Sequence, residues 1–135
     1  MTVNIRWLDS EQSILLHQYI GGYTIADYFS ALTHTNKLLC DTEKRIDIIS
    51  DLTEGTLLDT GILKAITDTG SYLLPQHHLF VLVGANAFIE RTIHIAMKIL
   101  PGIDRRLRIA TSLAEALYII HAARSHNADD SVAAW

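Results

Sequence analysis

Three carboxylates close together in the sequence could form a chemically active site: Asp51, Glu54 and Asp59. They lie in a polar stretch that also contains Thr53 and Thr60. Such a cluster can bind a metal ion or transfer protons. An acid–base pair also needs surroundings that move two pKa values apart, and nothing in this stretch indicates such surroundings. We therefore expect the acids to be solvated, and Asp59 and Thr60 to cap the helix that follows them.

The histidines do not form a recognisable catalytic or metal-binding pattern. The sequence has seven, and the only adjacent pair is His77 and His78. Neighbouring residues on a strand point to opposite faces, so this pair would not easily share a metal ion. The HExxH, GxSxG, P-loop and GxGxxG patterns do not occur. We predict no catalytic residues, no metal, no cofactor and no enzymatic activity.

Length, charge and cysteine content restrict the class of protein. The 135 residues fit one domain, and the net charge of -4 argues against a nucleic-acid partner. The single cysteine, Cys40, excludes an intramolecular disulfide and is typical of a cytoplasmic protein. The longest apolar run, residues 79–83 with Gly84 and Ala85, is too short to span a membrane.

Hydrophobic periodicity predicts alternating strands and helices. The expected strands are 4–8, 14–19, 45–52, 79–83 and 107–110, and the expected helices are 24–40, 59–73, 86–100 and 113–124. Gly21 and Gly22 are expected to end the second strand, and residues 53–56 to form a loop. Thr24, Asn86 and Ser112 are the expected helix caps.

This order predicts an α/β domain with a mixed five-stranded sheet and four helices. The first two strands are joined by a short turn and must be antiparallel, whereas strands separated by helices pair in parallel. The predicted domain covers residues 1–124, and residues 125–135 are expected to form a flexible C-terminal tail.

Helix 86–100 has an apolar arc that is wider than one sheet face requires. Its charged residues lie on one arc of the helical wheel, and Phe88, Ile95 and Ile99 lie outside the stripe that the sheet would cover. A neighbouring helix, a ligand, a partner protein or a second copy of the chain could cover these three side chains. A homodimer is therefore one of the expected assemblies.

Several segments resemble the STAS domain of bacterial anti-sigma-factor antagonists, the SpoIIAA-like proteins. They are the strand end Asp51-Leu52-Thr53, the helix start in residues 57–63 and the strand and helix in residues 107–117. The family pattern has two hydroxyl residues between its aspartate and glycine, and the first is phosphorylated. Here only Thr60 lies between Asp59 and Gly61, so the resemblance makes Thr60 the phosphoacceptor candidate.

The resemblance implies a non-enzymatic regulatory module that binds a protein, either an anti-sigma-like partner or itself. The predicted partner surface comprises Thr53, Glu54, Asp59, Thr60, Phe88, Ile95 and Ile99. The alternative is a sensor or carrier of a small molecule or lipid, because SpoIIAA-like proteins also resemble CRAL-TRIO-type lipid-binding folds. A closed apolar pocket under helices 24–40 and 86–100 would favour the alternative, and a flat exposed apolar patch would favour the protein-binding module.

Overall fold

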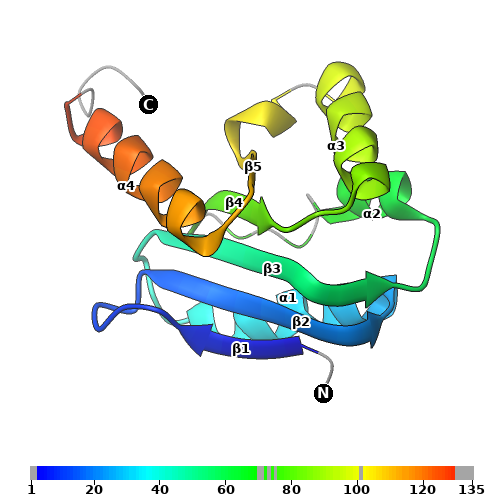
Figure 1. Cartoon of the computed structure of the whole chain (residues 1–135). Helices are drawn as coiled ribbons and strands as arrows, with labels where there is room; N and C mark the ends of the chain where they lie inside the picture. The colour runs from blue at the N-terminus through cyan, green and yellow to red at the C-terminus, as the bar shows by residue number, and fades with distance from the viewer. Residues whose placement is uncertain (1–2, 70–71, 73, 75, 101, 130–135) are drawn as a thin grey trace.

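In the residues that the structure describes, the fold is built from five strands, four α-helices and the short 3-10 helix η2 (Figure 1). The structure is a computed structural model that describes residues 3–69, 72, 74, 76–100 and 102–129. In chain order the elements are β1 (Val3–Trp7), β2 (Ile14–Tyr23), α1 (Ile25–Leu39), β3 (Ile46–Leu57), α2 (Ile62–Thr69), β4 (His77–Val83), α3 (Ala87–Ile99), η2 (Ile103–Arg105), β5 (Leu107–Ala110) and α4 (Leu113–Asp129).

The sheet has the predicted mixed topology. Its strands lie in the order β1-β2-β3-β4-β5; β1 is antiparallel to β2 and the other three pairs are parallel. The sequence order and the spatial order agree because each helix returns the chain to the next position in the sheet. The predicted fold class, a mixed five-stranded sheet with four helices, is confirmed.

Helices cover both faces of the sheet (Figure 1). Helix α4 packs on one face, where Ala116 and Ile120 are buried against Ile49 and Val81. Helices α1, α2 and α3 cover the other face, which we call the three-helix face. Its positions on β3 are Ile48, Ser50 and Leu52, because alternate strand residues point to the same side.

The three expected helix caps are present. The Thr24 hydroxyl accepts from the backbone N–H of Asp27, whose carboxylate accepts in return from the N–H of Thr24. The Asn86 side chain accepts from the N–H of Ile89, and the Ser112 hydroxyl accepts from the N–H of Glu115. The Glu115 carboxylate accepts from the Thr111 hydroxyl.

Strands β2 and β3 continue well past their predicted ends, and β4 begins two residues before its predicted start. Gly21 and Gly22 do not end β2, and residues 53–56 are not a loop but part of β3. The two extensions pair with each other, with Gly21 opposite Gly55 and Tyr23 opposite Leu57. Glycine weakens a strand locally, but mutual pairing satisfies the backbone N–H and C=O groups of both extensions. Long-range hydrogen bonding therefore overrides the local turn signal.

The second and the fourth predicted helices differ from the structure at their ends. Helix α2 runs only over Ile62–Thr69, so Asp59 and Thr60 lie before it rather than in its first turn. Helix α4 continues to Asp129, past the expected start of the tail at 125, and residues 130–135 lie outside the described residues. In the part of the chain that the structure describes, no helix combines the length and apolarity needed to cross a membrane.

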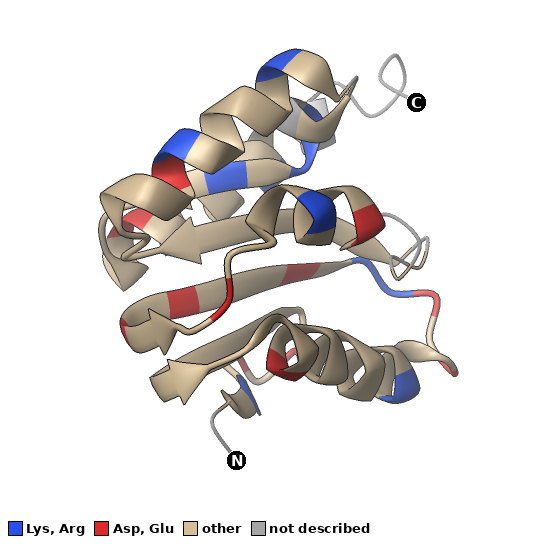
Figure 2. Ribbon diagram, turned by 90° about the vertical axis from the view of Figure 1, so that its right-hand side faces the viewer, with Lys and Arg blue, Asp and Glu red and all other residues tan. Residues whose placement is uncertain are grey.

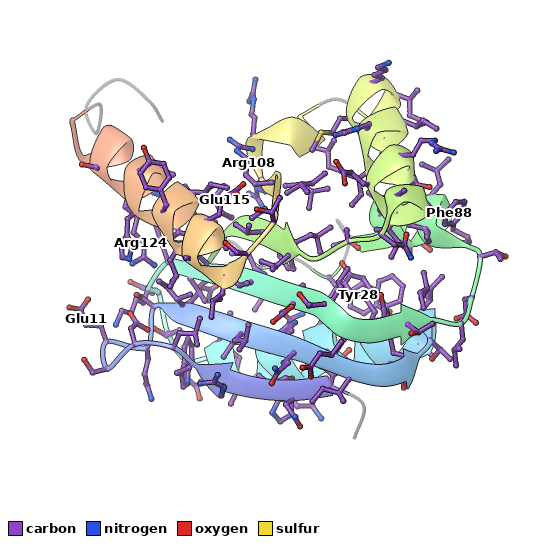
Figure 3. All side chains as sticks on the ribbon, viewed as in Figure 1. Glu11, Tyr28, Phe88, Arg108, Glu115 and Arg124 are labelled. Atoms are coloured by element: carbon purple, nitrogen blue, oxygen red, sulfur yellow. The ribbon has the colours of Figure 1, made fainter. Side chains whose placement is uncertain are left out.

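A buried polar network fixes α4 to the amino-terminal end of the sheet. Arg124 donates to the carboxylate of Asp47 at 2.8 Å and to both the hydroxyl and the carbonyl of Ser13 (Figure 3). His78 Nδ1 lies 3.0 Å from the other oxygen of Asp47, which is only 2% exposed. Burial raises the pKa of Asp47, but hydrogen bonds from His78 and Leu79 and the charge of Arg124 outweigh this and lower it.

Candidate functional site

A partly enclosed cavity of about 470 Å³ lies between the three-helix face of the sheet and helices α2 and α3. This volume falls within the range of small-molecule sites in proteins. Its apolar wall includes Ile25, Leu52, Leu57, Ile62, Ala65, Ile66, Phe80, Leu82, Ile89, Ile93, Leu100, Ile103 and Leu107. Tyr19, Tyr23, Tyr28, Ser50, Thr67, Thr69, Gly102 and Arg106 complete it.

The cavity exists because α2 and α3 pack closely on each other and only lightly on the sheet. Helix α2 is short and buries only Ile62 and Ala65, so few of its side chains can fill the space beneath it. The sheet contributes Ser50, a small residue between the larger Ile48 and Leu52 on the same face of β3. Small side chains on both sides therefore leave a volume that the core does not fill.

Two buried hydroxyls in the cavity wall lack hydrogen-bond partners. The side chains of Tyr19 and Ser50 are each about 1% exposed, and neither oxygen has a partner among the described residues. A buried hydroxyl that is left unpaired costs about 1–3 kcal/mol. Native structures keep such groups mainly where a water molecule, an ion or a ligand completes the bonding.

The neighbouring hydroxyls do pair. Tyr28, which reaches from α1 into the space beside the sheet, lies 2.8 Å from the Thr69 hydroxyl of α2 (Figure 3). Burial raises the pKa of Tyr28 to about 12. Burial, followed by the charges of Tyr28, Tyr23 and Asp27, also raises the pKa of Tyr19 well above its ordinary value. These phenols are neutral at physiological pH and can donate a hydrogen bond.

Arg106 carries the only charge among the described residues of the wall. It lies just before β5, and no described carboxylate is within ion-pair distance of its guanidinium. Arg106 is exposed, and its charge adds a smaller contribution to the burial that lowers the pKa of His77 to about 4. The wall therefore combines apolar surface with two hydroxyls and one cation for which the described residues provide no partner.

The polar residues of the predicted site lie outside the cavity. Thr53 and Glu54 are exposed on the extension of β3, and Thr60 is exposed before α2. Asp59 does not cap α2; its carboxylate accepts from the backbone N–H of Ile25 at 2.7 Å, at the start of α1. The Asp51 carboxylate accepts from the N–H of Thr53. Structural bonds thus occupy two of the three acids that we considered for chemistry.

The predicted apolar residues of α3 form an exposed patch. Phe88, Ile95 and Ile99 are 54%, 48% and 57% exposed, and Phe88 points away from the sheet at the start of the helix (Figure 3). Leu58 and Leu63, on the neighbouring segment before and in α2, are also exposed. Within the described part of the chain, no neighbouring helix covers these side chains, so this possible explanation of the wide apolar arc is excluded.

Sequence reasoning missed the cavity residues Tyr19, Ser50 and Arg106. In the sequence Tyr19 has the pattern of an ordinary strand residue, and Arg106 is one of several basic residues in the second half of the chain. Ser50 gives a detectable signal, because it is a polar residue between Ile48 and Leu52 at the alternate positions that share one face of β3. That signal shows where a side chain is small but not whether a neighbour fills the space.

The remaining titratable groups make structural contacts or are dispersed. His17 Nε2 lies 2.7 Å from the Thr35 hydroxyl, and His77 Nε2 lies 3.1 Å from the Asn36 side chain, so both histidines fasten α1 to the sheet. In the described ranges, no three histidine, cysteine or acidic side chains gather as metal ligands. Figure 2 shows acidic residues spaced along β3 and basic residues distributed over several helices.

Comparisons with known proteins identify the fold. No protein-family model and no curated protein matches the sequence. Among solved structures, an uncharacterized protein of the DUF3478 family with a SpoIIAA-like fold, from Shewanella loihica PV-4, has a TM-score of 0.60 and 18% identity, over 87% of this chain and 92% of that chain. A proposed anti-sigma factor antagonist from Thermotoga maritima has a TM-score of 0.54 and 16% identity, over 88% and 94%. The chain has a SpoIIAA-like α/β fold.

Proposed function

We propose that this protein is a cytoplasmic, non-catalytic binding domain that holds a small, largely apolar molecule in the cavity under α2 and α3. The cavity carries the proposal, because it has the volume and the apolar wall of a ligand site. It differs from the pocket that the alternative prediction named, because it is only partly enclosed and lies under α2 and α3, with Ile25 and Tyr28 as the contribution of α1. The unpaired hydroxyls of Tyr19 and Ser50 support it, since a bound molecule would supply their missing partners.

Ligand binding is tested by titration with a fluorescent apolar probe, N-phenyl-1-naphthylamine. We expect the probe to bind with enhanced emission, and Ala65→Phe to abolish binding because a phenyl ring on the inner face of α2 would fill the cavity. The matched control is Ala114→Phe, at an exposed position of α4 on the other face of the sheet. Equal probe binding by both variants would overturn the proposal.

A second function, protein binding through the exposed patch, is favoured by the exposure of Phe88, Ile95 and Ile99. The likeness to a proposed anti-sigma factor antagonist also supports a protein partner. The simplest form is a homodimer, with a mass of twice 15.1 kDa in light scattering at high concentration. We expect Phe88→Ser with Ile95→Ser to reduce that mass to 15.1 kDa and Tyr118→Ser, a control at an exposed aromatic on α4, to leave it unchanged. A wild-type protein that remains monomeric would exclude the homodimer.

A further inference from the structure

We propose that the cavity selects an apolar molecule bearing one negative charge, such as a medium-chain carboxylic acid, whose carboxylate binds Arg106. This inference rests on the proposed ligand-binding function and adds the chemical class of the ligand. The apolar body of the molecule would lie along the three-helix face of the sheet, and a second polar group would reach the hydroxyls of Tyr19 and Ser50.

The charge of the wall supports an anion over a neutral or cationic ligand. Arg106 is the one charged side chain among the described residues of the cavity, and its guanidinium has no described carboxylate partner. Arg106 is an exposed residue of the wall, and a carboxylate bound there would gain charge-assisted, bidentate hydrogen bonds from the guanidinium. A cationic ligand would meet the same charge as repulsion, with no acid in the described wall to offset it.

The strand register places the two polar regions far apart. Ser50 lies opposite Leu82, and Leu82 lies opposite Ile109 on β5. Arg106 precedes Ile109 by three residues, which is roughly 10 Å along the strand direction, and the two strand spacings between β3 and β5 add roughly 10 Å across the sheet. The wall between them is formed by Leu82, Phe80 and Leu107. The site therefore fits an elongated molecule with polar groups at its two ends.

A charge-swap titration tests the ligand class. Decanoate, decanol and decylamine, each below its micellar concentration, are titrated against the wild type by calorimetry. We expect decanoate to bind at least tenfold more tightly than decanol, and decylamine to bind most weakly. Arg106→Gln should remove the preference for decanoate, and Arg106→Glu should transfer it to decylamine. Arg105→Gln, at an exposed neighbour outside the wall, should retain the wild-type order.

The outcomes separate this inference from the proposed function. Equal affinities for the three compounds, abolished together by Ala65→Phe, would overturn the anion selectivity and leave a neutral apolar site. A preference for decanoate that survives Arg106→Gln would also overturn it. Absence of binding by all three compounds and by N-phenyl-1-naphthylamine would overturn both the anion selectivity and the proposed function.

A ligand with a second polar group tests the end of the cavity formed by Tyr19 and Ser50. We expect 10-hydroxydecanoate to bind more tightly than decanoate, and Tyr19→Phe with Ser50→Ala to cancel that gain.

Discussion

The carboxylate of Asp59 and the backbone N–H of Ile25 are joined by a hydrogen bond of 2.7 Å that spans 34 positions of the chain. It ties the segment before α2 to the first residue of α1. The amide at this helix start has no partner within the helix, and the positive end of the helix dipole favours a negative charge there. Thr24 bonds to Asp27 at the same helix start. Two carboxylates from distant segments therefore satisfy the amino terminus of α1.

Replacing Asp59 tests this bond. Asp59→Ala should lower the free energy of unfolding by about 0.5–1.5 kcal/mol, the usual net value of one hydrogen bond. Asp59→Asn retains an oxygen acceptor and should lose less, because only the interaction of the charge with the helix dipole disappears. Urea titrations of both variants and the wild type provide the measurement. Equal losses in the two variants would show that charge, and not the hydrogen bond, links these segments.

The glycine that ends β4 tests a close backbone contact. A Cβ atom at Gly84 would lie 2.9 Å from the Cα of Thr53, and its φ of +71° disfavours other residues. Gly21 has the same φ but no atom within 4 Å of such a Cβ. Gly21→Ala should therefore cost about 1–2 kcal/mol from backbone strain alone. Gly84→Ala should cost a further 1–3 kcal/mol, roughly, from overpacking. Urea unfolding of both variants measures the difference, and equal costs would exclude the steric contribution.

The succession of strands and helices along the chain and three of the helix caps could be predicted from the sequence because they depend on local patterns. Thr24 and Asn86 lie immediately before apolar periodic segments, and a capping side chain needs only the amides of the next turn. The extensions of β2 and β3 could not be predicted in the same way. Each contains glycine and reads as a loop by itself, and only the pairing of Gly21 with Gly55 makes both of them strand.

The two candidate sites differ in predictability for a related reason. The exposed patch follows from helical periodicity, so Phe88, Ile95 and Ile99 could be selected in advance. The cavity is a property of distances between packed elements, because it depends on how far α2 and α3 stand from the sheet. A sequence marks Ser50 as small and polar, but it does not show whether another side chain fills that space.

Two buried histidines predict how stability depends on pH. Burial, with smaller contributions from the charges of His77 and His34, lowers the pKa of His17 to about 3, and the pKa of His77 is about 4. The unfolded chain, with pKa values near 6.5, binds more protons than the folded chain below that pH. The free energy of unfolding should therefore decrease as pH falls from about 6.5 toward 4. Each histidine should contribute up to about 1.4 kcal/mol per pH unit to this decrease.

The measurement is urea unfolding at a series of pH values between 8 and 4.5. His17→Gln should reduce the slope below pH 6.5 by about one proton. Asp47 contributes to stability in a separate pH range. Because its pKa is lowered in the folded protein, the stability that it provides is lost only as pH falls to about 3.8, the ordinary pKa of a carboxylate, and below. Titration of His17 between pH 6 and 7 in the folded protein, observed by NMR, would contradict the expectation.

The phosphoacceptor prediction concerns Thr60, which is exposed before α2. Thr60→Glu should change the free energy of unfolding by less than about 0.5 kcal/mol, because the substitution is at the surface. It should weaken binding of a protein partner by tenfold or more, about 1.4 kcal/mol, if the partner contacts this segment, since it adds charge beside Asp59 and Glu54. Thr60→Gln is the uncharged control. Dissociation constants for a partner captured by the wild type provide the measurement, and equal binding by the two variants would exclude a charge-operated switch.

The unpaired hydroxyl of Tyr19 predicts opposite effects on stability and on binding. Tyr19→Phe removes a buried oxygen that has no partner among the described residues, so the ligand-free protein should be as stable as the wild type or more stable, by about 1 kcal/mol. Tyr28→Phe breaks the bond to Thr69 and should destabilise by about 0.5–1.5 kcal/mol. These two changes remove the same atom from the same kind of ring in one cavity wall, and they differ only in whether the atom is paired.

In the presence of 10-hydroxydecanoate the wild type should become more stable than Tyr19→Phe, because the wild type alone gains a hydrogen bond to the ligand. Urea unfolding with and without the ligand measures both effects. A loss of stability in ligand-free Tyr19→Phe equal to that in Tyr28→Phe would show that ordered water already satisfies the Tyr19 hydroxyl, and that this hydroxyl does not await a ligand.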